Sequence, residues 1–495
     1  MKTLYFQRKD FLPFLILLYL FLPFIIFLIG WIKPIISIPV LIILIVCFYR
    51  MVKSFPELWL PEISRENILN TVIILFIIII WVYFSGIGKF VAQNSDHFLR
   101  NGIFQTLVFE KWPIVNFYPS VKYYNKPISL VYYFGFWLPS AIIGKLFGLT
   151  AGYIAQMIWA SMGIFLFYFL IIAKYIQKII FWPLLVLIFF SGLDILGMYL
   201  LGNKFSDVSI TAHIEWWGIP FQFSSMTTQL FWVFNQAIPL WLATLLLIIQ
   251  KNNRCIAVII ALIMITSTLP FVGLVILAIC VIIRNIISKN LKKKVMFFLR
   301  DIFTFENIIG GGLIGIISFL YLKTNISSGS NGFLYYQSIK GTVFLWFLFY
   351  IIESGVYFIV IWKYQKNNYL LYYSTLWLAV CPWIVVGNSY DFCMRASIPA
   401  LIVVLLLVID TINKSYSIKD FKTFIAIIII LIIGSFTPIK EITRTTVSTV
   451  DRMRKNQSIA LESEDIWEDN FCGFIQDSIF FDYLARISKE RRVDK

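Results

Sequence analysis

Long apolar stretches alternate with short polar ones over most of this chain. Runs such as 41–48 and 71–84 hold almost no polar side chain, and about 20 apolar helical residues cross the hydrocarbon core of a bilayer. The pattern predicts thirteen spans, at residues 11–31, 35–50, 68–87, 151–173, 180–201, 228–249, 255–268, 270–286, 303–322, 341–362, 368–387, 396–413 and 422–438. The seventh and eighth are short, so they form either a hairpin or one broken helix.

Composition agrees with this pattern. The 495 residues are 60% hydrophobic and 14% charged, whereas soluble chains carry roughly 25% charged residues. We therefore predict an all-α polytopic membrane protein, a bundle of about 13 transmembrane helices with interfacial helices in its first large outer loop. The six cysteines form no CxxC pair, so neither a disulfide framework nor a thiolate metal site is predicted.

The net charge of +16 would point to nucleic acid in a soluble protein. Here the basic residues gather in short loops that fall on one side of the predicted bundle: Arg50, Lys53, Lys174, Lys178, Lys251, Arg254, Lys289, Lys292, Lys293, Lys294, Lys363 and Lys366. Such loops are cytoplasmic. We expect a multi-pass protein of a bacterial cytoplasmic membrane with a cytoplasmic N-terminus, no cleaved signal peptide, and the lipid bilayer rather than nucleic acid as a partner.

This orientation divides the chain into four parts. Residues 1–67 form an N-terminal hairpin and loop, 68–250 a membrane module with large outer loops 88–150 and 202–227, 251–438 the later helices, and 439–495 a short tail outside. Segments 323–340 and 387–395 also reach the outer face. Most of the chemically interesting residues fall on that face.

The first outer loop begins with the sequence QNSDHFLRNG at 93–102. Apolar residues at 99, 103 and 107 predict a short interfacial helix, with Asp96, Arg100 and Asn101 away from its apolar side. Asp96 and Arg100 are four residues apart and so share a face. His97 adjoins Asp96. Further on, Lys126 opens an aromatic segment whose run 129–148 is predicted to dip into the interface as a second helix.

Other polar residues collect at the same face. Asp194 lies within an apolar span, where a carboxylate is costly and a functional candidate. His213 and Glu215 follow in a Trp-rich loop, so both histidines of the chain adjoin acids.

Two more pairs complete the set. Asp391 and Arg395 lie between two spans, and a guanidinium suits phosphate. Asn235 and Gln236 open a later span. Each candidate also has a structural interpretation: Asp96 as a helix N-cap, Asp194 and the amides as satisfied polar groups, His213 and Glu215 as an exposed loop, Asp391–Arg395 as an ion pair. Their gathering on one face favours a site.

The order of these features resembles the GT-C superfamily of membrane glycosyltransferases, which use polyprenyl-phosphate-linked sugars. The resemblance rests on SDH (95–97), WP (112–113), KPI (126–128), YY (132–133) and LFG (146–148), and is closest to aminoarabinose and protein-mannose transferases. It covers roughly residues 68–250. This chain departs from the superfamily by its extra hairpin at 11–50 and by Asp-His in place of an acidic pair.

The resemblance implies roles for the candidates. Asp96 is expected to act as the general base toward an acceptor hydroxyl, with Asp194 as a second catalytic acid residue. Lys126 and Arg395 are expected to stabilise the leaving phosphate. His97, Arg100, His213, Glu215, Asn235, Gln236 and Asp391 are expected to bind substrate. A divalent ion held by the acids and histidines is one option, and the sequence leaves the metal unknown.

The implied function is sugar transfer from a polyprenyl-phosphate-linked donor to a cell-surface glycan, glycolipid or protein. A transporter or flippase of lipid-linked saccharides is one rival, since Glu353 lies in mid-span and membrane carboxylates serve in proton coupling. A polysaccharide polymerase is another, although its site is expected in a large late loop. A non-catalytic scaffold would not require clustered acids and histidines on one face.

Overall fold

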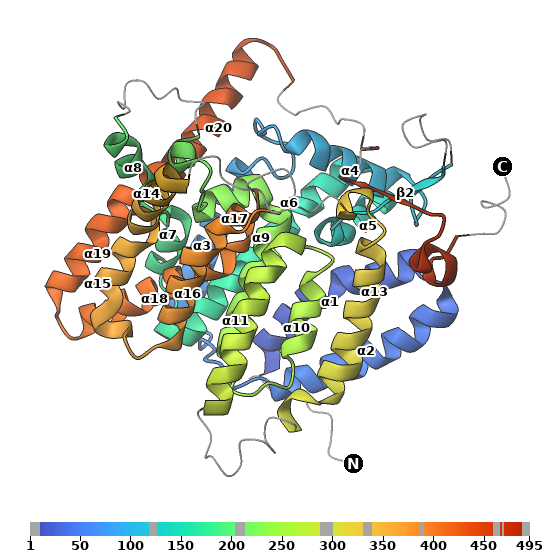
Figure 1. Ribbon diagram of the computed structural model, residues 1–495, viewed down its shortest axis with the longest axis horizontal. Helices are drawn as coiled ribbons and strands as arrows, with labels where there is room; N and C mark the ends of the chain where they lie inside the picture. The colour runs from blue at the N-terminus through green and yellow to red at the C-terminus, as the bar shows by residue number, and fades with distance from the viewer. Residues whose placement is uncertain are drawn as a thin grey trace.

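The structure is a computed structural model that describes residues 10–117, 126–202, 213–287, 300–329, 339–386, 391–458, 466–467 and 470–487. Helices dominate it (Figure 1). In these ranges ten helical segments are long and apolar enough to cross a membrane: Phe11–Trp31, Pro34–Ser54, Arg65–Phe84, Leu149–Ile176, Trp182–Leu200, Met226–Ile249, Thr268–Ile287, Gly341–Gln365, Asp391–Ser417 and Phe421–Arg454. An all-α polytopic membrane protein is thereby confirmed.

The elements that make up these segments and their connections are as follows. The helices are α1 (Phe11–Trp31), α2 (Pro34–Ser54), α3 (Arg65–Phe84), α4 (His97–Phe109), α5 (Leu138–Phe147), α6 (Leu149–Ile171), α7 (Trp182–Phe189), α8 (Asp194–Leu200), α9 (Met226–Ile249), α10 (Ile256–Ile263), α11 (Thr268–Ile287), α13 (Gly312–Leu322), α14 (Ile339–Tyr350), α15 (Val356–Gln365), α16 (Tyr369–Val380), α17 (Asp391–Ala396), α18 (Ile398–Ser417), α19 (Phe421–Gly434) and α20 (Phe436–Arg454). The strands are β1 (Val115–Asn116), β2 (Ile128–Leu130) and β3 (Cys472–Phe474).

Three of the thirteen predicted spans are shorter helices than expected. Span 255–268 contains only the eight-residue α10, 303–322 contains the 17 residues Glu306–Leu322, and 368–387 contains the twelve-residue α16. Their crossing of a membrane remains a prediction. The ambiguous pair at 255–286 consists of two separate helices, α10 and α11, which contact each other.

Two helices form the centre of the bundle. In both α9 and α18, 94% of the most apolar window is buried, whereas the value for α3 is 22%. Every residue of α9 except Trp232 is buried. A helix that is apolar on all sides is stable only when it is surrounded. Because α9 also carries Asn235 and Gln236, these amides are brought into the interior.

A small antiparallel sheet joins the first large loop to the C-terminal tail. Strand β2 pairs with β1 on one side and with β3 on the other, with Ser129 opposite both Val115 and Gly473. The second interfacial helix, predicted over 129–148, is therefore shorter: the segment begins in β2, and the helical part spans Gly135–Phe147. Backbone groups at 128–130 are taken by the sheet and are unavailable to a helix.

The tail also begins later than predicted. The last span was expected to end at residue 438, but α20 continues to Arg454 and packs against α9, α7 and α8. The span predicted at 180–201 is interrupted too, since residues 190–193 are not helical and Asp194 opens α8. In Figure 1, α4, α8, α20 and β2 lie at the upper end of the bundle, which carries the candidate site.

Candidate functional site

Asp96 sits at the start of α4 with its carboxylate directed to Arg100. Its Oδ2 accepts a hydrogen bond of 2.7 Å from Arg100 Nη2, and its side chain makes no capping hydrogen bond to the helix. The two partners differ in exposure: the Asp96 side chain is 40% exposed and the Arg100 side chain 9%. Arg100 and Asn101, predicted to lie on the polar side of the helix, are both buried: the Arg100 guanidinium lies over the Phe234 ring of α9, and Asn101 donates to Gln93 at 2.9 Å.

His97 does not bond to the acid beside it. Its Nδ1 accepts a hydrogen bond of 3.1 Å from Gln93, and the ring stacks on Phe234 at 5.6 Å. Burial, and then the charge of Arg100, lowers the pKa of His97 to about 3. His97 is therefore a buried, neutral imidazole at the start of α4, and its role in substrate binding stays a prediction.

A second ion pair of the same spacing faces this one. Arg395 on α17 donates to Asp391 at 2.8 Å, and here too the carboxylate is exposed (46%) and the guanidinium is not (15%). Arg395 also donates to the Tyr133 hydroxyl at 3.2 Å. Asp96 interacts electrostatically with Arg395, so the two pairs lie near each other.

The neighbouring Tyr132 interacts with the guanidinium groups of both Arg100 and Arg395. Burial raises the pKa of Tyr132 well above its usual value, and the charges of Arg395 and Arg100 each act to lower it. Gln236 of α9 donates to the Tyr133 hydroxyl at 3.2 Å. We call the set Asp96, Arg100, Tyr133, Gln236, Asp391 and Arg395 the guanidinium cluster.

Three buried polar atoms of this cluster have no hydrogen-bond partner within the described residues: Arg100 Nη1, Arg395 Nε and Gln236 Oε1. The same holds for both amide atoms of Asn235, which precedes Gln236 on α9. Buried polar groups are normally paired, so such atoms call for an explanation, for example a ligand or water. Helix α9 is also broken here, with Val233 at φ −140° and ψ 32°. Irregular backbone within a span is tolerated where it lines a cavity.

Lys126 is not part of this cluster. It precedes β2 and is exposed, whereas Arg395 is largely buried. Residues 387–390 of the predicted turn, 203–212 of the second outer loop and 330–338 of the third lie outside the described residues.

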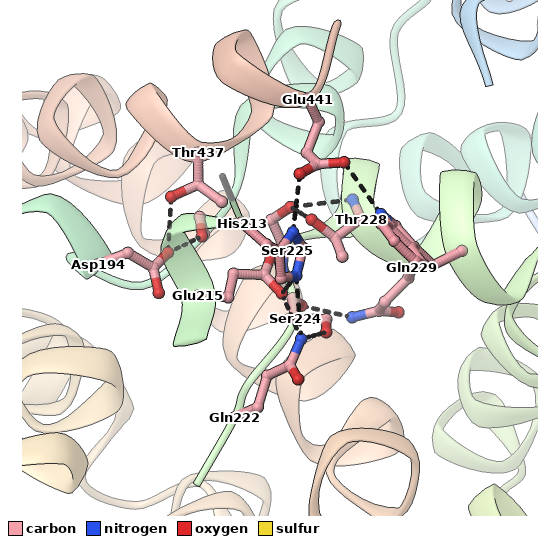
Figure 2. A network of polar contacts seen from close by, with 12 residues as sticks. Asp194, His213, Glu215, Gln222, Ser224, Ser225, Thr228, Gln229, Thr437 and Glu441 are labelled. Carbon is pink, nitrogen blue, oxygen red and sulfur yellow. Dashed lines mark hydrogen bonds and ion pairs between the residues drawn. The ribbon is translucent and has the colours of Figure 1, made fainter. Parts of the chain in front are cut away.

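A second polar group surrounds His213 (Figure 2). Its Nδ1 pairs with Glu441 of α20 at 2.9 Å, and its Nε2 lies 3.3 Å from Glu215. Burial acts to lower the pKa of His213, but the hydrogen bonds and charges of the two glutamates outweigh it and raise the pKa to about 10. His213 is therefore an imidazolium held between two carboxylates, and not part of an exposed loop.

Glu215 is fully enclosed by donors. Its Oε1 accepts from the Ser225 amide and its Oε2 from Gln222, each at 2.9 Å. Burial acts to raise the pKa of Glu215, yet the bond and charge of His213 lower it overall. Glu441 in turn accepts from Trp232 at 3.0 Å and pairs with Arg444. The positive and negative charges of this group thus alternate along a continuous chain of contacts.

Asp194 and Glu353 extend the group inward. Asp194 accepts from Ser191 at 2.9 Å and from Thr437 at 2.7 Å. Glu353 Oε1 accepts from Trp217 at 2.8 Å, its Oε2 has no hydrogen-bond partner among the described residues, and Glu353 interacts electrostatically with Asp194. We call Asp194, His213, Glu215, Glu353 and Glu441 the carboxylate–histidine network.

Sequence reasoning assigned no role to Glu441 or Arg444, because both fall in the predicted tail. A signal was present, however. Thr437, Glu441, Thr445 and Thr449 recur every four residues, and all four are buried. A polar stripe at helical spacing marks one face of a helix. Tyr133 entered the sequence analysis only as part of the YY motif at 132–133, and its contacts with Arg395 and Gln236 were not predicted.

In the part of the chain that the structure describes, no group of three or more His, Cys, Asp or Glu side chains is placed to hold a metal ion. Asp194, Glu215 and Glu441 are instead paired with hydroxyl, amide, indole, imidazole and guanidinium donors.

Comparisons with protein-family models, curated proteins and solved structures gave no match to this chain. The site is accordingly interpreted from its own geometry.

Proposed function

We propose that this chain is a membrane glycosyltransferase. In this proposal it moves a sugar from a polyprenyl-phosphate-linked donor to a cell-surface glycan, glycolipid or protein, at the outer face of a bacterial cytoplasmic membrane. One observation carries the proposal: an exposed carboxylate, Asp96, lies beside two buried guanidinium groups, Arg100 and Arg395, that retain unpartnered N–H donors.

The chemistry needs a base and an anion site close together. Asp96 takes the proton of the acceptor hydroxyl as its oxygen attacks the anomeric carbon. The bond from that carbon to the phosphate oxygen breaks, and the phosphate leaves with the electron pair. Arg100 and Arg395 meet the charge that develops on the phosphate, which preorganised donors do best in a site shielded from water. Asn235 and Gln236 offer amide groups to sugar hydroxyls.

Access to Asp96 supports this assignment. A groove of about 190 Å³ opens next to it, lined by Ala92, Gln93, Asn94, Ser95, Trp232, Arg444, Thr445 and Ser448. Ser95 at the edge of this groove immediately precedes Asp96 in the chain, so in this proposal the acceptor approaches along the groove. Lys126 is exposed, and in this proposal it attracts the anionic substrate toward the site and does not contact the leaving phosphate.

A second candidate function is proton-coupled transport of lipid-linked saccharides. The observation that favours it is the Asp194–Glu353 contact, because two adjoining buried carboxylates can share one proton and intramembrane acids often serve in proton coupling. Under this proposal Glu353, rather than Asp96, is the essential acid.

The test compares lipid-linked and surface glycans of cells carrying Asp96→Asn, Glu353→Gln or the wild-type chain with those of a deletion strain. Asp451→Asn, at an exposed ion pair of α20, is the matched control. Membrane insertion is measured in parallel. A transferase requires that Asp96→Asn insert normally, reproduce the deletion profile and accumulate unmodified acceptor. A wild-type profile for Asp96→Asn together with a deletion profile for Glu353→Gln would refute it in favour of transport.

A further inference from the structure

A separate groove adjoins the guanidinium cluster at Asp391. It has a volume of about 270 Å³ and is lined by Trp216, Ile219, Pro220, Phe221, Gln222 and Asp391. Ligand pockets for drug-sized molecules hold roughly 300–1,000 Å³, so this groove suits one small ring. Asp391 connects it to the cluster through its ion pair with Arg395.

Trp216 gives the groove an aromatic wall. Its side chain is 53% exposed although the next residue, Trp217, is buried. The His213 ring meets Trp216 edge to face at 5.2 Å and 72°, and the Trp216 backbone N–H, within the short 3-10 helix Ile214–Gly218, donates to the His213 carbonyl. The indole is therefore held in place from one side while it remains open to the groove.

Gln222 gives the groove a fixed acceptor. Its Nε2 donates to Glu215 at 2.9 Å and to Ser224 at 3.2 Å. Both hydrogen bonds use the nitrogen, and within the described residues none is made by Oε1. The amide orientation is thus set by buried neighbours, and the carbonyl oxygen is the atom left for a ligand (Figure 2).

The polar groups of the groove are acceptors. The Gln222 carbonyl and the Asp391 carboxylate, 46% exposed, both attract hydroxyl donors, and the carboxylate repels anions. An exposed indole offers an apolar face. A neutral sugar ring supplies both partners, with hydroxyl groups at its edge and C–H groups on its face. We infer that this groove is a subsite for one neutral saccharide ring.

The inference rests on the proposed function for the origin of the ring, which is the sugar of either the donor or the acceptor. Its first test does not use transfer. Methyl glycosides of glucose, galactose, mannose and N-acetylglucosamine are presented to the full chain in lipid nanodiscs, and saturation-transfer NMR records binding. The variants are Trp216→Ala, Trp216→Phe and Gln222→Leu. Trp362→Ala, at an exposed tryptophan of α15, is the control.

We expect at least one glycoside to bind the wild type and the Trp362→Ala variant. Trp216→Ala weakens binding about tenfold, as loss of a central aromatic contact does, and Trp216→Phe restores most of it. If no glycoside binds, or if binding is unchanged in both Trp216→Ala and Gln222→Leu, the inference is wrong. Retained binding without any sugar transfer would leave the subsite standing and refute the transferase proposal.

A second measurement identifies the source of the ring. In membranes with transfer activity, Trp216→Ala raises KM for the donor if the donor sugar occupies the groove, and for the acceptor if the acceptor sugar does. If Trp216→Ala has the same KM as the wild type for the donor and the same KM as the wild type for the acceptor, the inference is contradicted. A purely membrane-anchoring role for Trp216 would alter insertion and leave both KM values unchanged.

Discussion

His213 and Glu441 are 228 positions apart in sequence and are joined by a contact of 2.9 Å between Nδ1 and Oε1. This contact fastens α20 to the segment that leads into α9. Both side chains are almost fully buried, with 6% and 3% exposed. The helix after the last predicted span is thereby made part of the site.

Removing one partner of this pair should destabilise the protein strongly. Glu441→Gln leaves the imidazolium with one carboxylate and Arg444 with none of its described acid partners, and an uncompensated buried charge costs about 3–5 kcal/mol. We expect a marked fall in the thermal unfolding temperature of the purified protein in detergent. Asp451→Asn is the control, since its pair with Lys455 is exposed on both sides and such pairs contribute about 0–1 kcal/mol. Equal effects of the two changes would contradict this account.

The pH dependence of stability follows from the raised pKa of His213. Its pKa is about 10 in the folded protein against an ordinary value of 6.5, so the folded state holds a proton that the unfolded state has lost. The stabilisation is complete below about pH 6.5 and disappears as the pH rises through 10. Thermal unfolding at pH 6, 8 and 10 should show this loss in the wild type. His213→Gln should reduce that part of the pH dependence, and parallel curves would refute the assignment.

Arg395 is expected to act on the leaving phosphate. Losing one preorganised donor to a developing anion typically costs about 10²–10³ in rate. Arg395→Gln should therefore lower kcat/KM for a polyprenyl-phosphate sugar by that factor, with Arg395→Lys in between, because lysine keeps the charge and loses the forked geometry. Arg454→Gln, an exposed arginine of α20, should have no effect. Unchanged kinetics for both Arg395 variants would exclude a role in leaving-group stabilisation.

Gly192 is predicted to be essential for the position of Glu353. A Cβ added at this residue would lie 1.6 Å from Glu353 Oε2 and 3.0 Å from its Cα, so Gly192→Ala must displace both side chain and backbone. Overpacking of this kind costs about 1–3 kcal/mol. At Gly315 the nearest atom would be 4.0 Å away, and Gly315→Ala should be neutral or slightly stabilising. Thermal unfolding of the two variants measures the difference, and equal values would show that Glu353 relaxes freely.

The fold was largely accessible from hydropathy. Ten predicted spans coincide with the long apolar helices, because crossing a bilayer demands a continuous apolar length that is visible in the sequence. Of the three spans that are shorter helices in the structure, only 255–268 stood out as short in the sequence. Strand β2 and the length of α20 were missed, since a three-residue strand depends on partners at residues 115–116 and 472–474, and α20 has a polar stripe instead of an apolar run.

The candidate site was accessible only in part. Residues four apart on one helix, such as Asp96 with Arg100 and Asp391 with Arg395, could be paired from spacing, and both ion pairs form. His97 and His213 looked alike in sequence, each beside an acid. Their environments differ because one is surrounded by Phe234 and Gln93 and the other by two glutamates.

The sequence by itself determined that this is a helical membrane protein whose sparse polar residues collect between apolar spans, because the cost of burying backbone and charge in lipid acts on every residue locally. The tertiary structure alone decided which of those residues meet. Glu441 with His213, Glu353 with Asp194, and Arg395 with Tyr133 are contacts between distant segments. They arise from how helices pack around α9, and although a periodic stripe such as that of α20 marks a buried face, it does not say which distant residue will meet that face.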